Sequence, residues 1–525
     1  MVNNITAQLK LSSHLVERWG VAMLPDGRSL QGALTLEGIS LWSVVSSDLA
    51  STGVAKRLSN KSSNTTFKDQ FIQTLKNTAR RLMFDAKRKL YPGSGKLDFF
   101  PDGDVFLFLG FSHYIYRETL EPVARKLQDI SNSSVVVIDD QYKDYTRSVV
   151  SGELRQSTVW QFSPPDIEAN IDMMRRSLNR EKSYLVQSDI LKRIIEDTGC
   201  PWAEFKPLFD WLLDTYFHRL IVYIAIAKYI IARHRPSLII SPDVNDPRTR
   251  IFCLAGRLAN IKTLEVQFSF SSPANVEWKF FIADHLAVTG PNNYDQMLCH
   301  GIHPSMMSIT GSPRYDHSVY RGPLATSREI RSFYKIDDKF NVVLFASQPF
   351  YHEAFINAKI REEMILDLFS SASESSGQLL LVKPHPFDRV SELKTLARGF
   401  RNIVFADGRV DIRFLINACN AFVTFFSTTT FDALVMRKPT MHLAYPDAYH
   451  DKTFENCDAI IRAVCKADVM SFFSPGKNNE IYGVVASREL ARVNYLNGWL
   501  YGQDGQATDR IASIAVGLKR PCNHS

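Results

Sequence analysis

The arrangement of hydrophobic and polar positions changes near residue 102. From there on, short and continuous apolar runs rich in β-branched residues alternate with longer stretches whose apolar residues recur every three or four positions. The short runs are typical of strands buried on both faces of a parallel sheet, and the longer stretches are typical of amphipathic helices. This alternation predicts an α/β fold.

The apolar runs form two successive sets. The first set occupies 104–110, 133–140, 237–243, 262–268, 285–290 and 306–312. The second set occupies 341–347, 378–386, 402–407, 421–427 and 439–445. Helices are predicted at 116–128, 246–259, 353–370, 388–398, 411–419 and 429–437. Two such sets predict two Rossmann-like domains that face each other across a cleft.

The length of 525 residues is compatible with two large domains and flanking segments. We expect an N-terminal extension of unknown role at 1–95 and a first domain at 96–312, with a helical insertion at about 166–236. A second domain is expected at 313–480, and a helical tail that packs back across the domains at 481–525.

Composition and charge exclude several classes of protein. Apolar residues make up 45% and charged residues 22% of the chain, as in a soluble globular protein. The net charge of +7 comes without a block of like charges, so a nucleic-acid-binding arm is not expected. Seven scattered cysteines without a C-x2-C pair argue for reduced thiols and against a zinc site.

No secretory signal pattern is recognisable near the N-terminus. The longest apolar run, 220–232, contains Lys228 and is shorter than the roughly 20 residues that a membrane span needs. We therefore expect a cytoplasmic protein. The basic segment 75–91 has two interpretations, a solvent-facing helix or a peripheral contact with the anionic inner membrane.

The ends of the predicted strands carry the candidate chemistry, because open parallel sheets bind ligands beyond the carboxyl ends of their strands. The run "LLLV" is followed by Lys383, Pro384, His385 and Pro386. An imidazole fixed between prolines and next to a lysine can donate a charge-assisted hydrogen bond to a phosphate. A purely structural histidine is the alternative interpretation.

A second strand end carries a run of hydroxyls at 427–430, "STTT", which opens a helix. Side-chain hydroxyls, free backbone N–H groups and the positive end of the helix dipole together favour a phosphate site. An ordinary helix N-cap is the simpler alternative.

The His-Pro dipeptide and the Ser/Thr run occur together with "GSPRYD" at 311–316 and "VLFASQP" at 343–349. This set resembles bacterial GT-B glycosyltransferases of surface polysaccharide synthesis, among them the sialyl- and polysialyltransferases, the capsule Kdo-transferases and the CDP-glycerol glycerophosphotransferases. The resemblance covers about 235–450 well and 100–150 weakly.

The resemblance implies roles for particular residues. His385, Ser427 and Thr428 would hold the phosphate of the donor nucleotide, Lys383 or Arg389 would add positive charge, and Asp411 would meet the ribose unless it only caps its helix. The full set of candidate donor-binding residues is Lys383, His385, Pro386, Arg389, Asp411, Ser427, Thr428 and Thr429.

Glycosyl transfer also requires a carboxylate that activates the acceptor hydroxyl. The sialyltransferase D/E-D/E-G motif has a partial match in Asp139-Asp140-Gln141, so Asp139 and Asp140 are, together with His385, the candidate catalytic residues. Asp243 and Asp246 are rival bases, and aspartates that merely cap strand ends are the simpler interpretation.

One position departs from the related families. Many capsule and glycerophosphate enzymes have Gln-His-Gly where this chain has Gln267-Phe268-Ser269. No D-x-D motif follows an apolar strand in the manner of a metal-dependent GT-A enzyme, so we expect no metal and no cofactor.

These observations favour an inverting, metal-independent glycosyltransferase. Its donor would be a nucleotide-sugar, with CMP-activated acidic sugars as one class, and its acceptor a surface glycan or a lipid-linked glycan. A degenerate GT-B protein that binds a nucleotide or a partner enzyme is the main alternative. A UDP-sugar 2-epimerase and a CDP-glycerol-type phosphotransferase are further alternatives.

Overall fold

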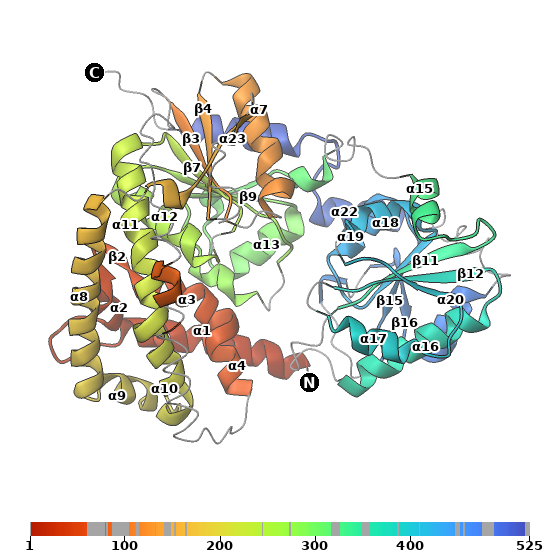
Figure 1. The fold of residues 1–525 in the computed structure, drawn as a ribbon, viewed down its shortest axis with the longest axis horizontal. Coiled ribbons are helices and arrows are strands. Elements are labelled where there is room, and N and C mark those ends of the chain that lie inside the picture. The colour runs from red at the N-terminus through yellow and green to blue at the C-terminus, as the bar shows by residue number, and fades with distance from the viewer. Residues whose placement is uncertain are drawn as a thin grey trace.

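A computed structural model describes most of the chain. The described residues are 2–59, 79, 82–86, 104–111, 115–131, 133–140, 149–151, 154–162, 165–243, 245–271, 275–316, 326–348, 358–385, 388–408, 410–446, 452–454, 457–474 and 488–519. Two α/β bodies lie side by side, with the N-terminal helices below the first body (Figure 1).

Eight strands of the described residues form the sheet of the first domain, in the order β10-β9-β8-β7-β3-β4-β6-β5. They are β3 (Val105–Leu109), β4 (Ser134–Asp139), β5 (Val149–Ser151), β6 (Leu154–Thr158), β7 (Leu238–Ser241), β8 (Thr263–Val266), β9 (His285–Val288) and β10 (Met307–Ile309). All neighbours are parallel except the edge pair β5 and β6. The central strands are buried on both faces, as their continuous apolar runs require.

Helices cover both faces of this sheet. One face packs against α7 (Glu121–Ile130) and α23 (Ala507–Leu518). The other face packs against α11 (Phe217–His234) and α12 (Pro247–Leu258).

The N-terminal segment shares the core of the first domain. It contains α1 (Val2–Val21), α2 (Leu30–Ala33), β1 (Thr35–Leu36), β2 (Ile39–Ser40), α3 (Leu41–Asp48), the π-helical turn η1 (Leu49–Gly53) and α4 (Val54–Ser59). The ring of Trp19 lies edge-on to Phe205 at 5.3 Å, and Trp42 stacks on Phe209 at 6.2 Å. Residues 9–54 and the helical insertion therefore share one hydrophobic core with one face of the first sheet.

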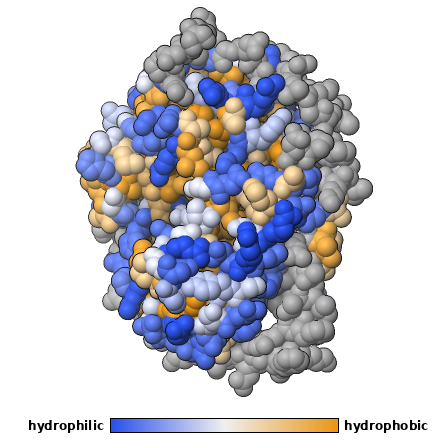
Figure 2. Space-filling model, turned by 90° about the vertical axis from the view of Figure 1, so that its left-hand side faces the viewer, coloured by the Kyte–Doolittle hydropathy of each residue, from blue (hydrophilic) through white to orange (hydrophobic). Residues whose placement is uncertain are grey.

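The helical insertion consists of α8 (Pro165–Gln187), α9 (Ile190–Glu196), α10 (Trp202–Trp211), the π-helical turn η5 (Leu212–Tyr216) and α11. Among the described residues, one continuous helix, Trp202–His234, is long and apolar enough to cross a membrane, and most of its apolar window is buried inside the protein. The face in Figure 2 includes the outer side of this insertion, where hydrophilic residues lie between smaller groups of hydrophobic ones.

The second domain has a parallel sheet in the order β13-β12-β11-β14-β15-β16. Its strands are β11 (Asn341–Ala346), β12 (Gln378–Lys383), β13 (Ile403–Phe405), β14 (Ala421–Thr424), β15 (Thr440–Leu443) and β16 (Ile460–Ala463). Its helices are α15 (Ser327–Phe333), α16 (Ala358–Glu374), α17 (Val390–Leu396), α18 (Ile412–Ala418), α19 (Thr429–Val435) and α20 (Lys466–Phe473). Two sheets that are parallel except for the β5–β6 pair confirm the predicted pair of Rossmann-like domains.

The C-terminal helices return to the first domain. Helix α22 (Glu489–Trp499) contacts both α19 of the second domain and α13 (Pro291–Cys299) of the first. Helix α23 then packs on α7 and on the first sheet. A Cβ atom at Gly290 would lie 2.5 Å from the carbonyl carbon and oxygen of Trp499, so glycine is needed where α22 passes α13.

Candidate functional site

A cavity of about 650 Å³ lies between the two domains. The first domain contributes residues that follow β3, β8 and β10, and the second contributes residues that follow β11, β12, β13 and β14. The lining side chains that can bind an anion are Arg117, Ser269, Arg314, Ser347, Lys383, His385, Ser427, Thr428 and Thr429. The predicted cleft therefore exists, and it lies at the carboxyl ends of both sheets.

Lys383 is the last residue of β12, and His385 follows it in the cavity wall. The Lys383 ammonium donates a hydrogen bond of 2.6 Å to the carbonyl oxygen of Gly408. Burial lowers the pKa of Lys383 and the pKa of His385. A bound phosphate would oppose this effect, because a nearby negative charge favours the protonated form of both groups.

The backbone of His385 is fixed by the neighbouring strand. Its N–H donates to the Ser347 hydroxyl at 3.2 Å, and this hydroxyl donates to Asp388 at 2.6 Å. Asp388 is in turn paired with Arg361 at 3.1 Å. The histidine is thus held by a connected set of buried polar groups. Pro386, the residue that follows it, lies outside the described residues.

The hydroxyl run divides between the cavity and the core. Ser427, Thr428 and Thr429 line the cavity, and Ser427 accepts hydrogen bonds from the Thr429 amide at 3.3 Å and hydroxyl at 2.9 Å. Thr430 is buried and pairs with His442 Nε2 at 2.8 Å. Three of the four hydroxyl residues therefore lie where a phosphate can reach them.

The other two candidates of the second domain have different positions. Asp411 lines the cavity and caps α18, with an ion pair of 2.6 Å to Arg413. Burial acts to raise the pKa of Asp411, but hydrogen bonds from Arg413 outweigh it and lower the pKa. Arg389 is not part of the cavity lining, because its exposed side chain pairs with Glu392 at 2.8 Å.

An ionic network joins the domains at one side of the cavity. Arg314, which follows β10, forms ion pairs with Glu118 of the first domain and, at 2.8 Å, with Asp432 of the second. Arg413 reaches Glu118 at 3.3 Å from the second domain. Asp432 is fully buried, and burial raises its pKa. Sequence patterns did not reveal this network, because its members lie on four separate segments.

The loop after β8 contains Gln267-Phe268-Ser269, where many related enzymes have Gln-His-Gly. Gln267 is buried, and its amide donates to the Ser269 carbonyl at 2.7 Å and to Asn293 at 3.1 Å. These contacts hold Phe268 in the cavity wall. Phe270 stacks on Phe431 of the second domain with ring centroids 3.7 Å apart. The loop is therefore a structured contact between the domains.

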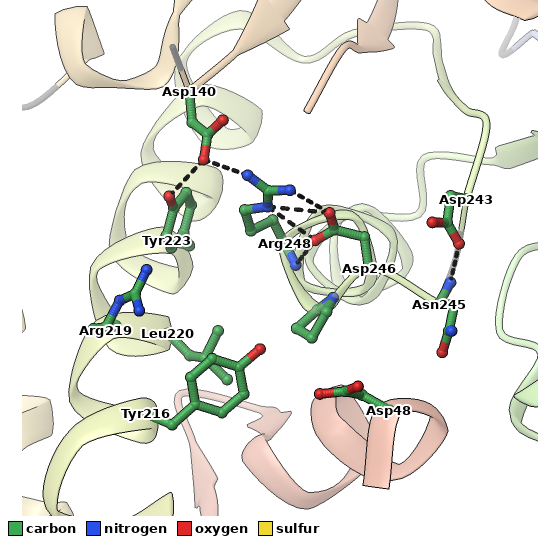
Figure 3. Close-up of a pocket in the computed structure, with 11 residues that line it drawn as sticks. Asp48, Asp140, Tyr216, Arg219, Leu220, Tyr223, Asp243, Asn245, Asp246 and Arg248 are labelled. Carbon is green, nitrogen blue, oxygen red and sulfur yellow. Dashed lines mark hydrogen bonds and ion pairs between the residues drawn. The ribbon is translucent and has the colours of Figure 1, made fainter. Parts of the chain in front are cut away.

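The two predicted catalytic aspartates do not line the cavity that contains His385. Asp139, at the end of β4, accepts a hydrogen bond of 3.0 Å from Gln156. Asp140 lines a second cavity of about 370 Å³, where it pairs with Arg248 and accepts a hydrogen bond of 3.0 Å from the Tyr223 hydroxyl (Figure 3). The structure therefore separates the predicted phosphate site from the predicted base.

The rival bases Asp243 and Asp246 line the same second cavity. Asp246 caps α12 and is bound by the guanidinium of Arg248 at 2.9 Å. Asp243 accepts a backbone hydrogen bond from Asn245 at 2.8 Å. Burial, aided by the charge of Asp246, raises the pKa of Asp243 to about 7. A pKa of about 7 suits Asp243 to the role of a general base near neutral pH.

The comparison with protein families covers less than half of the chain. Residues 283–456 are similar to the transferase family described as CDP-Glycerol:Poly(glycerophosphate) glycerophosphotransferase. This segment includes Lys383, His385 and the hydroxyl run, and it begins after Gln267-Phe268-Ser269. No curated protein is significantly similar in sequence to the chain.

Solved structures show the similarity of fold. The UDP-GlcNAc 2-epimerase of Methanocaldococcus jannaschii aligns with a TM-score of 0.51 and 13% identity, over 78% of this chain and 100% of that one. The S. aureus MnaA structure with UDP aligns with a TM-score of 0.50 and 13% identity, over 81% and 100%. The wall teichoic acid polymerase TagF aligns over 86% of this chain and 98% of that one, at 12% identity and with a lower TM-score of 0.45. The predicted GT-B fold class is confirmed, and within it residues 283–456 are similar to a family of transferases.

Proposed function

We propose that the chain is a transferase that binds a nucleotide-linked donor in the cavity between its domains. The observation that carries this proposal is the gathering of Lys383, His385 and three hydroxyl residues at the carboxyl ends of the second sheet, opposite Arg117 and Arg314 of the first domain. Cationic and hydroxyl donors that converge from two domains suit a phosphate group.

We favour cytidine nucleotides, because residues 283–456 are similar to the CDP-glycerol enzymes and the His-Pro and Ser/Thr motifs resemble those of sialyltransferases, which use CMP-sugars. Transfer from CDP-glycerol breaks the bond between the β-phosphorus and the bridging oxygen, whereas transfer from a CMP-sugar breaks the bond at the anomeric carbon. Both reactions release CMP. His385 and Lys383 would stabilise the charge that develops on this leaving phosphate, and no metal would be required.

The identity of the transferred group has two candidates. The similarity of residues 283–456 to the CDP-glycerol enzymes favours a glycerophosphoryl group. The combination of the His-Pro and Ser/Thr motifs favours an acidic sugar that is transferred with inversion. In both cases we expect the acceptor to be a hydroxyl of a surface glycan or a lipid-linked glycan, reached from the cytoplasmic face of the membrane where activated donors are made.

The proposal can be tested by donor binding and CMP release without metal. Wild type would be titrated with CDP-glycerol, CMP-sialic acid, UDP-GlcNAc and GDP-mannose, and binding would be followed by the rise in melting temperature. His385→Ala should lose at least about tenfold in donor affinity, because a charge-assisted hydrogen bond is worth about 1.5–3 kcal/mol. His14→Ala is the matched control, because His14 is exposed on α1.

Each outcome selects one interpretation. Stabilisation by a cytidine donor that is lost only in His385→Ala supports the transferase, and the stabilising donor identifies the transferred group. Conversion of UDP-GlcNAc without an acceptor would instead identify a 2-epimerase. If no nucleotide stabilised the wild type, the proposal would fail and a non-enzymatic scaffold would be the better interpretation.

A further inference from the structure

The second cavity, of about 370 Å³, is built by segments that are far apart in the sequence. The N-terminal segment contributes Asp48, the π-helical turn η5 and α11 contribute one wall, and the chain that follows β4 and β7 contributes the rest. Its lining residues are Asp48, Asp140, Tyr216, Arg219, Leu220, Tyr223, Asp243, Asn245, Asp246, Pro247 and Arg248 (Figure 3).

Several of these groups are already paired with each other. Arg248 binds both Asp140 and Asp246, and its guanidinium lies 5.2 Å from the centroid of the Phe111 ring. The Tyr223 hydroxyl donates a hydrogen bond to Asp140 and so belongs to the same network. The Arg248 network therefore acts as a rigid, saturated wall of the cavity.

The remaining polar groups are only partly paired. One carboxylate oxygen of Asp48 accepts a hydrogen bond of 2.9 Å from the Thr52 hydroxyl. In Figure 3 the Tyr216 hydroxyl and the Asp48 carboxylate point toward each other across the cavity. Among the described residues, the Nε atom of Arg219 is buried without a hydrogen-bond partner. Asp243 uses one carboxylate oxygen for the Asn245 amide. The lining of the cavity thus offers carboxylate acceptors, a buried N–H donor and a hydroxyl.

The charge of the cavity selects the class of ligand. Four carboxylates face two guanidinium groups, and burial raises the pKa of both Asp48 and Asp243. Added negative charge is therefore unfavourable here, so a phosphate or a carboxylate is a poor ligand. Hydroxyl groups can donate to the carboxylates and accept from Arg219, and the tyrosine rings present flat surfaces for a sugar ring.

The sheet places this cavity beside the cavity between the domains. Strands β7 and β8 are parallel neighbours, with Ser241 opposite Glu265. The chain that leaves β7 carries Asp243, and the chain that leaves β8 carries Phe268 in the donor cavity. Neighbouring strands lie about 4.8 Å apart, so the two binding spaces open from adjacent strand ends.

We propose that this second cavity binds the uncharged, hydroxyl-bearing end of the acceptor, and that Asp243 accepts the proton of the attacking hydroxyl. This inference rests on the proposed transferase function. The hydroxyl oxygen forms the new bond to the donor, the bond to CMP breaks with its electron pair on the phosphate oxygen, and the proton passes to Asp243 and then to water. The N-terminal segment then has a role, because it supplies Asp48.

The inference also predicts how transfer depends on pH. Asp243 acts only when ionised, so transfer rises as pH increases through about 7. The titratable groups that line the cavity with Asp243 are Asp48, Asp140, Asp246, Arg219, Arg248, Tyr216 and Tyr223. Arg250 and Glu277 also interact with Asp243 electrostatically. The nearby acids Asp246 and Glu277 act in the same direction as burial and raise the pKa of Asp243.

Ligand class can be tested by saturation-transfer NMR on the full chain. Glycerol and the methyl glycosides of glucose, galactose and N-acetylglucosamine serve as uncharged probes, and glycerol 3-phosphate serves as the anionic probe. We expect at least one uncharged probe to bind, and to lose about tenfold in affinity in Asp243→Asn and in Tyr216→Phe. The first variant replaces one carboxylate acceptor oxygen by an NH2 donor, and the second removes a hydroxyl. Asp337→Asn, at an exposed turn of the second domain, is the control that should bind normally.

The catalytic part is tested by separating donor binding from transfer. Asp243→Asn should retain the affinity for the cytidine donor but lose about 100-fold or more in acceptor-dependent CMP release, together with its rise near pH 7. Tighter binding of glycerol 3-phosphate, absence of binding by all uncharged probes, or unchanged transfer in Asp243→Asn would overturn the inference. If the wild type bound no nucleotide donor, the proposed function itself would be refuted.

Discussion

Arg314 offers the sharpest test of how the two domains are held together. Its side chain is 16% exposed and its guanidinium lies between Glu118 and Asp432, whose side chains are 7% and 0% exposed. Replacing it by methionine keeps most of the volume but leaves two buried carboxylates without this partner. Arg413 still reaches Glu118 at 3.3 Å, whereas Asp432 loses both of its hydrogen bonds from Arg314.

We expect Arg314→Met to lower the free energy of unfolding by about 3–5 kcal/mol at pH 8, the usual result of removing one partner from a buried ion pair. The loss should shrink at pH 4.5. Burial raises the pKa of Asp432 in the intact protein, and removal of the guanidinium raises this pKa further. The stability that a raised carboxyl pKa supports is present at low pH and is lost as pH rises through that pKa.

The assay is urea denaturation followed by tryptophan fluorescence at both pH values. Arg328→Met is the matched control, because Arg328 is exposed on α15. The double variant Arg314→Met/Asp432→Asn should recover part of the loss, because it removes the unpaired charge together with its partner. A loss below about 1 kcal/mol at pH 8, or an equal loss at both pH values, would refute the reasoning.

Three further predictions follow from local geometry. Gly290→Ala should destabilise the protein by about 1–3 kcal/mol, because its Cβ would press on the backbone of Trp499. Gly517→Ala, whose Cβ meets no atom within 4 Å, should be neutral or slightly stabilising in the same thermal melts. Phe270→Ala should lower the free energy of unfolding by about 2 kcal/mol in urea titrations, because it removes the contact with Phe431. Phe333→Ala, at an exposed position, should have no such effect, and equal effects would contradict the assigned stacking. In wild type the pKa of Asp243 is about 7 instead of the ordinary 3.8, so its ionisation lowers stability between pH 4 and 8. After allowance for solvent screening, Asp243→Asn should therefore be more stable than wild type by roughly 2 kcal/mol at pH 8 but not at pH 4. If denaturation curves showed the same difference in stability at both pH values, the assigned pKa would be contradicted.

The sequence predicted the strands that are buried on both faces. The run at 104–110 became β3, one residue shorter at each end, and the run at 341–347 became β11, one residue shorter at its C-terminal end. Such strands need continuous apolar residues, which the sequence shows directly. Strand β6, Leu154–Thr158, which lies next to the edge strand β5, escaped prediction because its sequence "LRQST" is mostly polar. Strand β16 was also missed, since only the first and last of its four residues are buried.

The candidate site was predictable to the extent that strand ends determine it. Lys383, His385 and Ser427 meet because they follow parallel strands of one sheet, β12 and β14, whose carboxyl ends lie at one edge. Asp48 and Arg219 could not be assigned to a site, because their meeting depends on how two helical segments pack against the first sheet. Asp411 lines the cavity between the domains, whereas Asp140, Asp243 and Asp246 line the second cavity. This division likewise depends on tertiary structure.

The return of the C-terminal helices also affects the order in which the protein can fold during synthesis. Helix α23 buries Ile511, Ala512 and Ala515 against the face of the first sheet that contains Phe106 and Leu238. A ribosome completes all strands of both sheets before it makes this helix. The part of the first sheet that α23 covers therefore stays exposed to solvent until the second domain has been synthesised. Chains that end before 507 would expose this face and are expected to aggregate or to be bound by chaperones.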